Sequence, residues 1–176
     1  MSADQAERLL VTIRPTSAID QTRKELAVEQ LADIRRLDAA IDSTRLRLAS
    51  AVQATHTSLT DIYGVGPVVA GIIIGHVRDV SRFPSSGHFA SYNATAPIEA
   101  SSGPRKRHRL NPRGNRTVNY ALHMAAVTQI RNDTPGRAYY QRKLAEGKTT
   151  KEAMRAPKRR ISDVVYRHLQ RDLDHR

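Results

Sequence analysis

The sequence contains no cysteine among its 176 residues, which excludes disulfide bonds, thiolate metal sites and a cysteine nucleophile. Aromatic residues make up only 5% of the chain and are scattered, so a stacking platform for single-stranded nucleic acid is not indicated. No segment approaches the roughly 20 apolar residues that cross a bilayer, and the start, MSADQAERLL, lacks the basic and apolar regions of a signal peptide. We therefore expect a cytoplasmic protein with no membrane partner.

Acidic residues are also scarce, because 17 Asp and Glu stand against 29 Lys and Arg, and the formal net charge is +12. Such an excess indicates a polyanionic partner, with nucleic acid as the first candidate. The carboxylates lack the H-E-x-x-H spacing of a metal site, so we expect no metal in this chain. A G-x-S-x-G sequence is missing too, which leaves a Ser–His–Asp hydrolase unsupported.

Residues 20–53 contain neither glycine nor proline, and they follow a lead-in at residues 1–18 that we expect to be loosely ordered. Apolar side chains recur at every seventh position, at Ala27, Ile34, Ile41 and Leu48. This period predicts a long amphipathic helix of coiled-coil type. At about 45 Å the helix would be longer than a small core can cover, so it either packs on its own domain or takes part in a dimer.

The segment SLTDIYGVGPVVAGIIIGHVRDVSRF, residues 58–83, predicts two helices joined by a tight turn. Gly64 and Gly66 permit unusual φ angles, and Pro67 suits the first position of the second helix. This form is typical of a helix–hairpin–helix, in which backbone N–H groups at a helix start bind a phosphate. Gly64, Val65 and Gly66 are therefore candidate nucleic-acid-binding residues, with a plain turn between packed helices as the alternative.

Residues 84–116 are irregular and rich in Gly, Pro, Ser and Asn, with brief strands expected at 96–100 and 107–110. Basic side chains crowd the second half of this segment with no acid between them. They are Arg105, Lys106, Arg107, Arg109, Arg113 and Arg116. In a loop, such a density indicates a clamp for nucleic-acid phosphates.

Two serines, Ser101 and Ser102, stand directly before this basic stretch. Arginines can stabilise both a serine alkoxide and the charge that develops on an attacked phosphate. From the residues alone, however, the serines are better explained as turn formers.

The helical period returns over residues 117–130 and 137–146, and TTKE at 149–152 predicts a capping box for a last helix. Pro157 falls inside that helix, where proline is expected to force a kink or a break. The sequence thus predicts a mainly α fold, with a long helical, coiled-coil-like arm at residues 1–55. A helical domain with a helix–hairpin–helix and an irregular basic loop follows at residues 56–176.

Four motifs follow one another in the chain, and they are LTDIYGVGPVVAGIIIGHVRDVSRFPS, FASYNATAPIEASSG, RLNPRGNRTVNYALHMAAVTQIR and GRAYYQRKLAEGKTTKEAMRAPKRRISD. Together they resemble the C-terminal half of the IS110, IS116 and IS902 insertion-sequence transposases, relatives of the Piv/MooV invertases. The resemblance implies a serine, placed before a glycine, that becomes covalently linked to DNA. The matching residue is Ser102, with Ser101 as the alternative. It also implies an N-terminal RuvC-like domain whose DEDD carboxylates bind a divalent metal, magnesium in our expectation, and this domain has no counterpart in the chain.

The resemblance further implies DNA, a structured guide RNA from the element, and either further copies or an intact transposase as partners in a bacterial cytoplasm. Three positions depart from the family pattern, because Ala94 and Pro104 stand where glycine is usual and Pro157 where an apolar helix former is usual. We therefore expect a truncated DNA transposase that binds DNA but joins DNA strands only in an intact assembly. Two alternatives are a non-catalytic helix–hairpin–helix nucleic-acid-binding protein and a modulator that forms mixed oligomers with an intact transposase.

Overall fold

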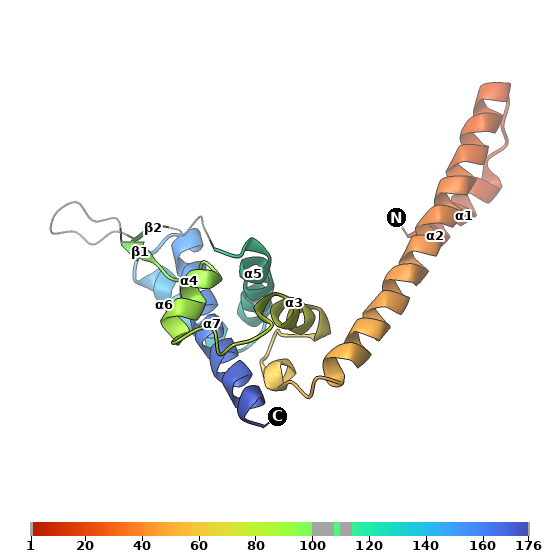
Figure 1. Ribbon diagram of the computed structural model, residues 1–176. Helices are drawn as coiled ribbons and strands as arrows, with labels where there is room; N and C mark the ends of the chain where they lie inside the picture. Colours follow the sequence, from red (N-terminus) through yellow and green to blue (C-terminus); the bar gives the residue numbers. More distant parts are fainter. Residues whose placement is uncertain (1, 100–107, 110–113, 176) are drawn as a thin grey trace. The chain divides into compact units, whose positions relative to one another are not determined.

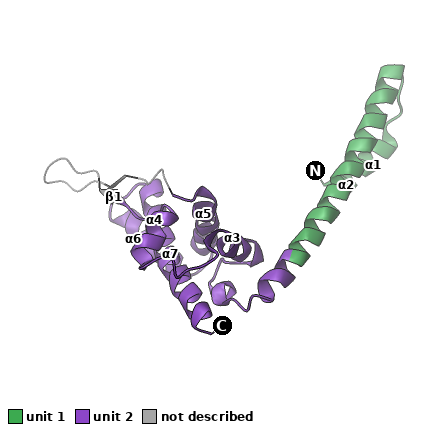
Figure 2. Ribbon diagram, in the orientation of Figure 1, with its two compact units in different colours: residues 1–47 green, residues 48–176 purple. Residues whose placement is uncertain are grey.

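The computed structural model of the protein describes residues 2–99, 108–109 and 114–175. Contacts divide the chain into two compact units, residues 1–47 and residues 48–176 (Figure 2). Within the described ranges the secondary structure consists of seven α-helices, one 3-10 helix and two short strands. The predicted mainly α fold is therefore confirmed, while the predicted domain boundary after residue 55 stays a prediction.

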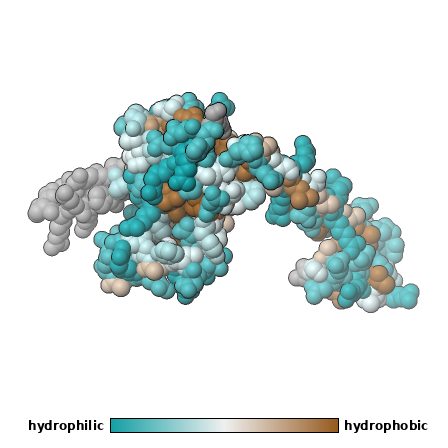
Figure 3. Space-filling model, turned by 90° about the horizontal axis from the view of Figure 1, so that it is seen from below, coloured by the Kyte–Doolittle hydropathy of each residue, from teal (hydrophilic) through white to brown (hydrophobic). Residues whose placement is uncertain are grey.

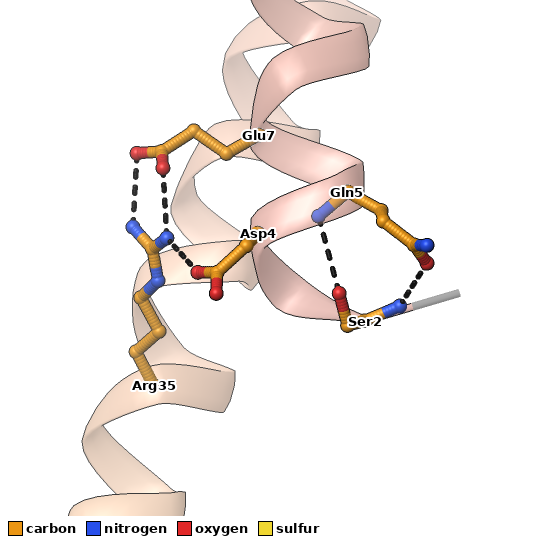
Figure 4. A network of polar contacts seen from close by, with 5 residues as sticks. All are labelled: Ser2, Asp4, Gln5, Glu7 and Arg35. Atoms are coloured by element: carbon orange, nitrogen blue, oxygen red, sulfur yellow. Dashed lines mark hydrogen bonds and ion pairs between the residues drawn. The ribbon is translucent and has the colours of Figure 1, made fainter.

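Unit 1 contains α1, Ala3–Thr12, and most of α2, Ala18–Gln53, which run alongside each other (Figure 1). The lead-in is thus helical rather than loosely ordered, because Ser2 and Gln5 form a capping box that begins α1. Arg35 of α2 donates to both carboxylate oxygens of Glu7, at 2.9 and 2.7 Å, and to Asp4 at 2.9 Å (Figure 4). These ion pairs are exposed, so they orient α1 on α2 but add little stability.

The predicted long helix is confirmed by α2. Its heptad residues Ile34 and Ile41 are 50% and 48% exposed, and Leu31 is the buried hydrophobic residue among those described in unit 1. Figure 3 shows further apolar side chains along this unit, separated by hydrophilic ones. The apolar stripe of α2 is thus only partly covered within the unit.

Unit 2 contains the last turns of α2 and all remaining elements (Figure 1). These are η1 (Ser58–Asp61), α3 (Pro67–Val77), α4 (Ser86–Tyr92), β1 (Ile98–Glu99), β2 (His108–Arg109), α5 (Arg116–Arg131), α6 (Pro135–Ala145) and α7 (Thr150–Asp174). Helix α5 packs against α3, α6 and α7, and α7 also packs against α4 and η1. Helices α5 and α7 therefore form the centre to which the other elements attach.

The core of unit 2 follows the helical period that the sequence shows. On α5 the buried side chains are Val118, Ala121, Leu122, Ala125 and Ala126, spaced three and four residues apart along one face. Phe89 of α4 is completely buried, and its ring lies 5.3 Å from that of Phe83 and 5.7 Å from that of Tyr166 on α7. These aromatic contacts join α4 to α7.

Helix α7 is continuous from Thr150 to Asp174, with Pro157 inside it. The expected break at this residue is therefore wrong, although the predicted capping box of Thr149 and Glu152 is present. Proline has no N–H to donate to the carbonyl of Ala153, so one helical hydrogen bond is lost. The ring of Pro157 is fully buried, and this burial offsets part of that cost.

Candidate nucleic-acid interface

The predicted helix–hairpin–helix differs from expectation in its first part. Over residues 56–66, which the structure describes throughout, the chain forms the 3-10 helix η1 and then the turn Gly64–Val65–Gly66, which leads into α3. Leu59 and Ile62 are buried as the sequence indicates, but they belong to a single 3-10 turn and the residue after it. The segment thus has one α-helix after the turn and none of comparable length directly before it.

The three turn residues have different environments. Gly64 has a φ of +86°, and a Cβ there would lie 2.7 Å from the carbonyl oxygen of Ala125 on α5. Val65 is buried, whereas nothing lies within 4 Å of a Cβ built on Gly66. Gly66 is the N-cap of α3 and provides no side-chain cap, so the first N–H groups of α3 are left without an intrahelical partner. Gly64 and Val65 therefore serve packing, and Gly66 is the turn residue that faces open space.

A short hairpin stem holds the segment that carries the serines. β1 and β2 pair antiparallel, with Ile98 opposite Arg109 and Glu99 opposite His108. Strands are present within both predicted ranges, at Ile98–Glu99 and at His108–Arg109 among the described residues. Several predicted site residues lie outside the described residues, and these are Ser101, Ser102, Arg105, Lys106, Arg107 and Arg113.

Asn115 fixes the position where the chain leaves this segment and enters α5. Its Oδ1 accepts the N–H of Val118 at 3.0 Å, which caps α5. Its backbone N–H donates to the carbonyl of Tyr92 at 2.6 Å, and its Nδ2 donates to the Tyr92 hydroxyl at 2.9 Å. The Tyr92 hydroxyl in turn donates to the carbonyl of His76 at 2.9 Å. The residue that begins α5 is thus tied to the end of α4 and to α3.

Asn93 fixes the position where the chain enters the segment. Its side chain is fully buried, and Nδ2 donates to Oγ of Ser162 on α7 at 2.7 Å. Its Oδ1 accepts from the hydroxyl of Thr95 at 2.6 Å and from the N–H of the same residue at 3.2 Å. Its carbonyl oxygen accepts from Nδ2 of Asn119 on α5 at 2.8 Å. We call Asn93, Asn115 and their hydrogen-bond partners the loop base.

Ala94 stands where glycine is usual in the family pattern, and the backbone conformation at this position accounts for that glycine. The φ of Ala94 is +58°, in the left-handed region that glycine adopts most easily. The N–H of Thr95 bonds to the carbonyl of Ala90 at 2.9 Å, and the N–H of Ala94 bonds to that of Ser91 at 3.2 Å. These two bonds form a Schellman motif at the end of α4, in which the left-handed residue is usually glycine. A Cβ on Gly114 would come 2.5 Å from the Ala94 Cβ, so the two ends of the loop meet closely here.

Ala94→Gly is expected to raise the free energy of unfolding by about 0.5 kcal/mol, because relief of the left-handed strain exceeds the added chain entropy of glycine. Ala90→Gly is the matched control, since Ala90 is also buried but lies inside α4. There the substitution is expected to cost about 1 kcal/mol. Urea denaturation followed by circular dichroism measures both. Equal losses in the two variants would show that the backbone of Ala94 carries no strain.

The GVG turn and the loop base lie at different places along α5. Gly64 packs against Ala125, whereas Arg116 is exposed at the first position of the helix. Nine residues of helix separate the two, which corresponds to about 13 Å. The predicted phosphate-binding turn therefore does not lie beside Arg116, the residue of the predicted basic stretch at the start of α5.

A serine, a histidine and an aspartate meet elsewhere, in an arrangement that the sequence does not reveal. Ser58 Oγ lies 2.8 Å from Nδ1 of His168 and donates to Asp172 Oδ1 at 2.6 Å. Asp172 also accepts from the Thr57 hydroxyl at 2.7 Å and from the Ser58 N–H at 3.0 Å. Burial by itself would raise the pKa of Asp172, but the hydrogen bonds from Ser58 and Thr57 outweigh it and keep the pKa below its ordinary value.

This cluster borders a cleft of about 600 Å³ that is lined by residues 54–56, which follow α2, by Ser58 of η1 and by the C-terminal end of α7. In a catalytic triad the carboxylate orients the histidine, whereas Asp172 accepts from the serine itself and from the start of η1. The cluster therefore joins α7 to η1 and lacks the geometry of a hydrolase.

Among the residues that the structure describes, no three His, Asp or Glu side chains are grouped so that they could hold a metal ion. None of the described helices combines the length and the apolar character needed to cross a membrane.

Residues 56–141 match the sequence profile described as the Transposase IS116/IS110/IS902 family. The chain is 38% identical over 106 residues to the 43.6 kDa protein of insertion element IS110 from Streptomyces coelicolor, an alignment that covers 59% of this chain and 26% of the relative. It is 33% identical over 104 residues to the 44.8 kDa protein of insertion element IS116 from Streptomyces clavuligerus, which covers 58% and 26%. A 42 kDa protein of insertion element IS900 from Mycobacterium paratuberculosis is 33% identical over 89 residues, or 50% of this chain and 22% of the relative. The chain thus spans about a quarter of the length of these relatives.

Proposed function

The chain carries a transposase domain of the IS116/IS110/IS902 family, and on this basis we propose that unit 2 binds DNA and presents Ser102 to a DNA phosphate. In an intact assembly this serine would join DNA strands. Ser101 is the alternative nucleophile, because it is the adjacent hydroxyl.

The observation that carries the proposal is the loop base. Asn93 and Asn115 hold the two ends of the segment that contains the serines and the basic stretch, and they attach both ends to α4, α5 and α7. A nucleophile gains most from positioning when the residues around it are themselves fixed by hydrogen bonds. The sequence places the S-G pair and the arginines between these two fixed ends.

In the proposed step, Ser102 Oγ attacks phosphorus, and the bond from phosphorus to one bridging oxygen of the DNA breaks. The proton of the serine passes to the departing oxygen, so one DNA end becomes a hydroxyl and the other a phosphoserine ester. Attack by a different DNA hydroxyl on this ester reverses the step and joins new ends. Arg105, Arg109 and Arg113 would stabilise the charge that develops on the phosphate oxygens.

The divalent metal that the resemblance implies belongs to the RuvC-like domain, where it would supply Lewis-acid chemistry. In this chain we assign the task of phosphate binding to arginine, lysine and backbone N–H groups. A guide RNA and oligomer formation through the exposed apolar side chains of α2, such as Ile34 and Ile41, complete the proposed partners.

The test incubates the chain with DNA from an element end and Mg²⁺, with and without a separately expressed RuvC-like domain, and looks for a covalent protein–DNA adduct on denaturing gels. We expect Ser102→Ala to abolish the adduct and Ser101→Ala, the matched control, to retain it. An adduct that persists in Ser102→Ala and disappears in Ser101→Ala would transfer the role to Ser101. Persistence of the adduct in the double variant would overturn the serine mechanism.

A non-catalytic nucleic-acid-binding protein is the second candidate, and the net charge of +12 favours it. It predicts DNA binding whose affinity falls steeply with salt, and no adduct under any of these conditions. Because Ser102→Ala removes only a hydroxyl, we expect it to change DNA affinity by less than about twofold in both cases. Formation of the adduct, rather than affinity, therefore separates the two functions.

A further inference from the structure

Lys158 is a half-buried basic residue of unit 2 for which, in the described part of the chain, no ion pair is found, unlike the half-buried Lys143 and Arg159. Nζ of Lys158 donates to Oδ1 of Asn119 on α5 at 2.7 Å. Burial, together with the neighbouring charges of Arg116 and Arg155, lowers the pKa of this lysine to about 8. His123 is affected in turn, since burial and the charge of Lys158 lower its pKa.

In the described part of the chain no ion pair joins Lys158 or Arg116 to a carboxylate, whereas the charge of Arg155 acts on Glu152, three residues before it on α7. The ion pairs of unit 2 there join other basic residues, Arg142, Lys143 and Arg159, to Glu146 and Asp163. The first turn of α5 contains no acid and begins with Arg116, which is unfavourable next to the positive end of a helix dipole. The folded chain therefore holds the half-buried charge of Lys158 close to the exposed charges of Arg116 and Arg155, at a cost in stability.

Lys158 and Arg116 lie next to the loop base. Arg116 directly follows Asn115, and Asn119 both accepts from Lys158 and donates to the carbonyl of Asn93. The hydrogen bonds of the loop base thus extend to Lys158. An anion bound there would lie beside both fixed ends of the segment that carries Ser102.

We propose that Lys158, Arg116 and Arg155 form a binding site for a backbone phosphate of DNA at the loop base. This inference rests on the proposed function and adds the site that holds the DNA backbone next to the attacked position. An arginine fork and an ammonium group suit a phosphodiester, which presents two charged oxygens. The bound phosphate would supply the counter-charge that Lys158 and Arg116 lack in the described part of the protein.

The affinity of this site for DNA is expected to fall as the pH rises and Lys158 loses its proton. The phosphate favours the charged lysine, so binding takes up a proton whenever Lys158 is neutral in the free protein. Between pH 7 and pH 9 the charged fraction of Lys158 falls about tenfold around its pKa of about 8, and DNA affinity should fall by up to about tenfold. The pKa of His123 is lowered by burial and by the charge of Lys158, so this histidine does not produce the pH dependence between pH 7 and pH 9.

The experiment measures the affinity of the full chain for a short DNA duplex by fluorescence anisotropy at constant salt, from pH 7 to pH 9. Lys158→Met is expected to weaken binding about tenfold at pH 7 and to remove the pH dependence. Lys158→Arg keeps the charge at every pH, so its affinity should stay high and nearly constant. Lys143→Met is the matched control, because Lys143 is also half-buried but already paired with Glu146 at 2.6 Å, and it should bind like the wild type.

A second readout uses inorganic phosphate and the NMR signal of the Lys158 side chain, which we expect phosphate to shift toward the charged form. If the wild type binds no DNA but phosphate shifts this signal, the proposed function fails and the anion site stands. If DNA binds equally well to Lys158→Met, or if Lys158→Arg keeps the wild-type pH dependence, the inference is overturned while the proposed function stands. A pH-dependent loss with structured RNA and none with DNA would also overturn it.

Discussion

Gly64→Ala is expected to lower the free energy of unfolding by about 2–4 kcal/mol, one of the two largest effects of a single substitution that we predict for this chain. The φ of Gly64 is +86°, which strains any residue with a Cβ. The new methyl group would also lie 2.7 Å from the carbonyl oxygen of Ala125, a backbone atom that cannot rotate away. Urea denaturation of the full chain, followed by circular dichroism, measures the loss as a lower transition midpoint.

Gly66→Ser provides the matched control for this prediction. Gly66 belongs to the same turn, has a φ of −81° and has nothing within 4 Å of an added Cβ. A serine there can also cap α3, so stability should change by less than about 0.5 kcal/mol or rise slightly. Similar stabilities of Gly64→Ala and Gly66→Ser would contradict the packing role that we give to Gly64. The pair also separates the need for glycine at a close backbone approach from the need for an open helix start.

Asn93→Ala is expected to destabilise unit 2 by about 3 kcal/mol, because it leaves several buried groups without partners. The hydroxyl of Ser162 loses its donor and the hydroxyl of Thr95 loses its acceptor, while the Thr95 N–H keeps its bond to the carbonyl of Ala90. If the loop base positions the nucleophile, adduct formation should fall at least about tenfold even at temperatures where the variant stays folded. Denaturation and adduct yield are measured on the same preparations.

Asn132→Ala serves as the control for this substitution. Its Nδ2 donates to the carbonyl of Thr128 at 2.8 Å near the exposed end of α5, far along the helix from the loop base. We expect a loss below about 0.5 kcal/mol and an unchanged adduct yield. A folded Asn93→Ala variant that forms adduct at the wild-type rate would show that the loop base supports the fold without positioning Ser102.

Much of the secondary structure could be predicted from the sequence, because helices depend on nearby residues. The absence of glycine and proline from residues 20–53 predicts α2, and the apolar period after residue 117 predicts the buried face of α5. Thr149 and Glu152 predict the start of α7 by a local reciprocal bond. The prediction was wrong where packing outweighs local preference, since Pro157 lies within a continuous helix and is fully buried.

The same difference between local and long-range information applies to the candidate site. The sequence by itself determined the excess of positive charge, the S-G pair, the GVG turn and the family motifs, because each of these is a property of neighbouring residues. Only the tertiary structure decided that Asn93 bonds Ser162, that Gly64 packs on Ala125 and that Lys158 bonds Asn119. Each of these contacts joins segments that are distant in the chain. Their distances depend on how α4, α5 and α7 pack against one another, and packing is a collective property that no local pattern of residues specifies.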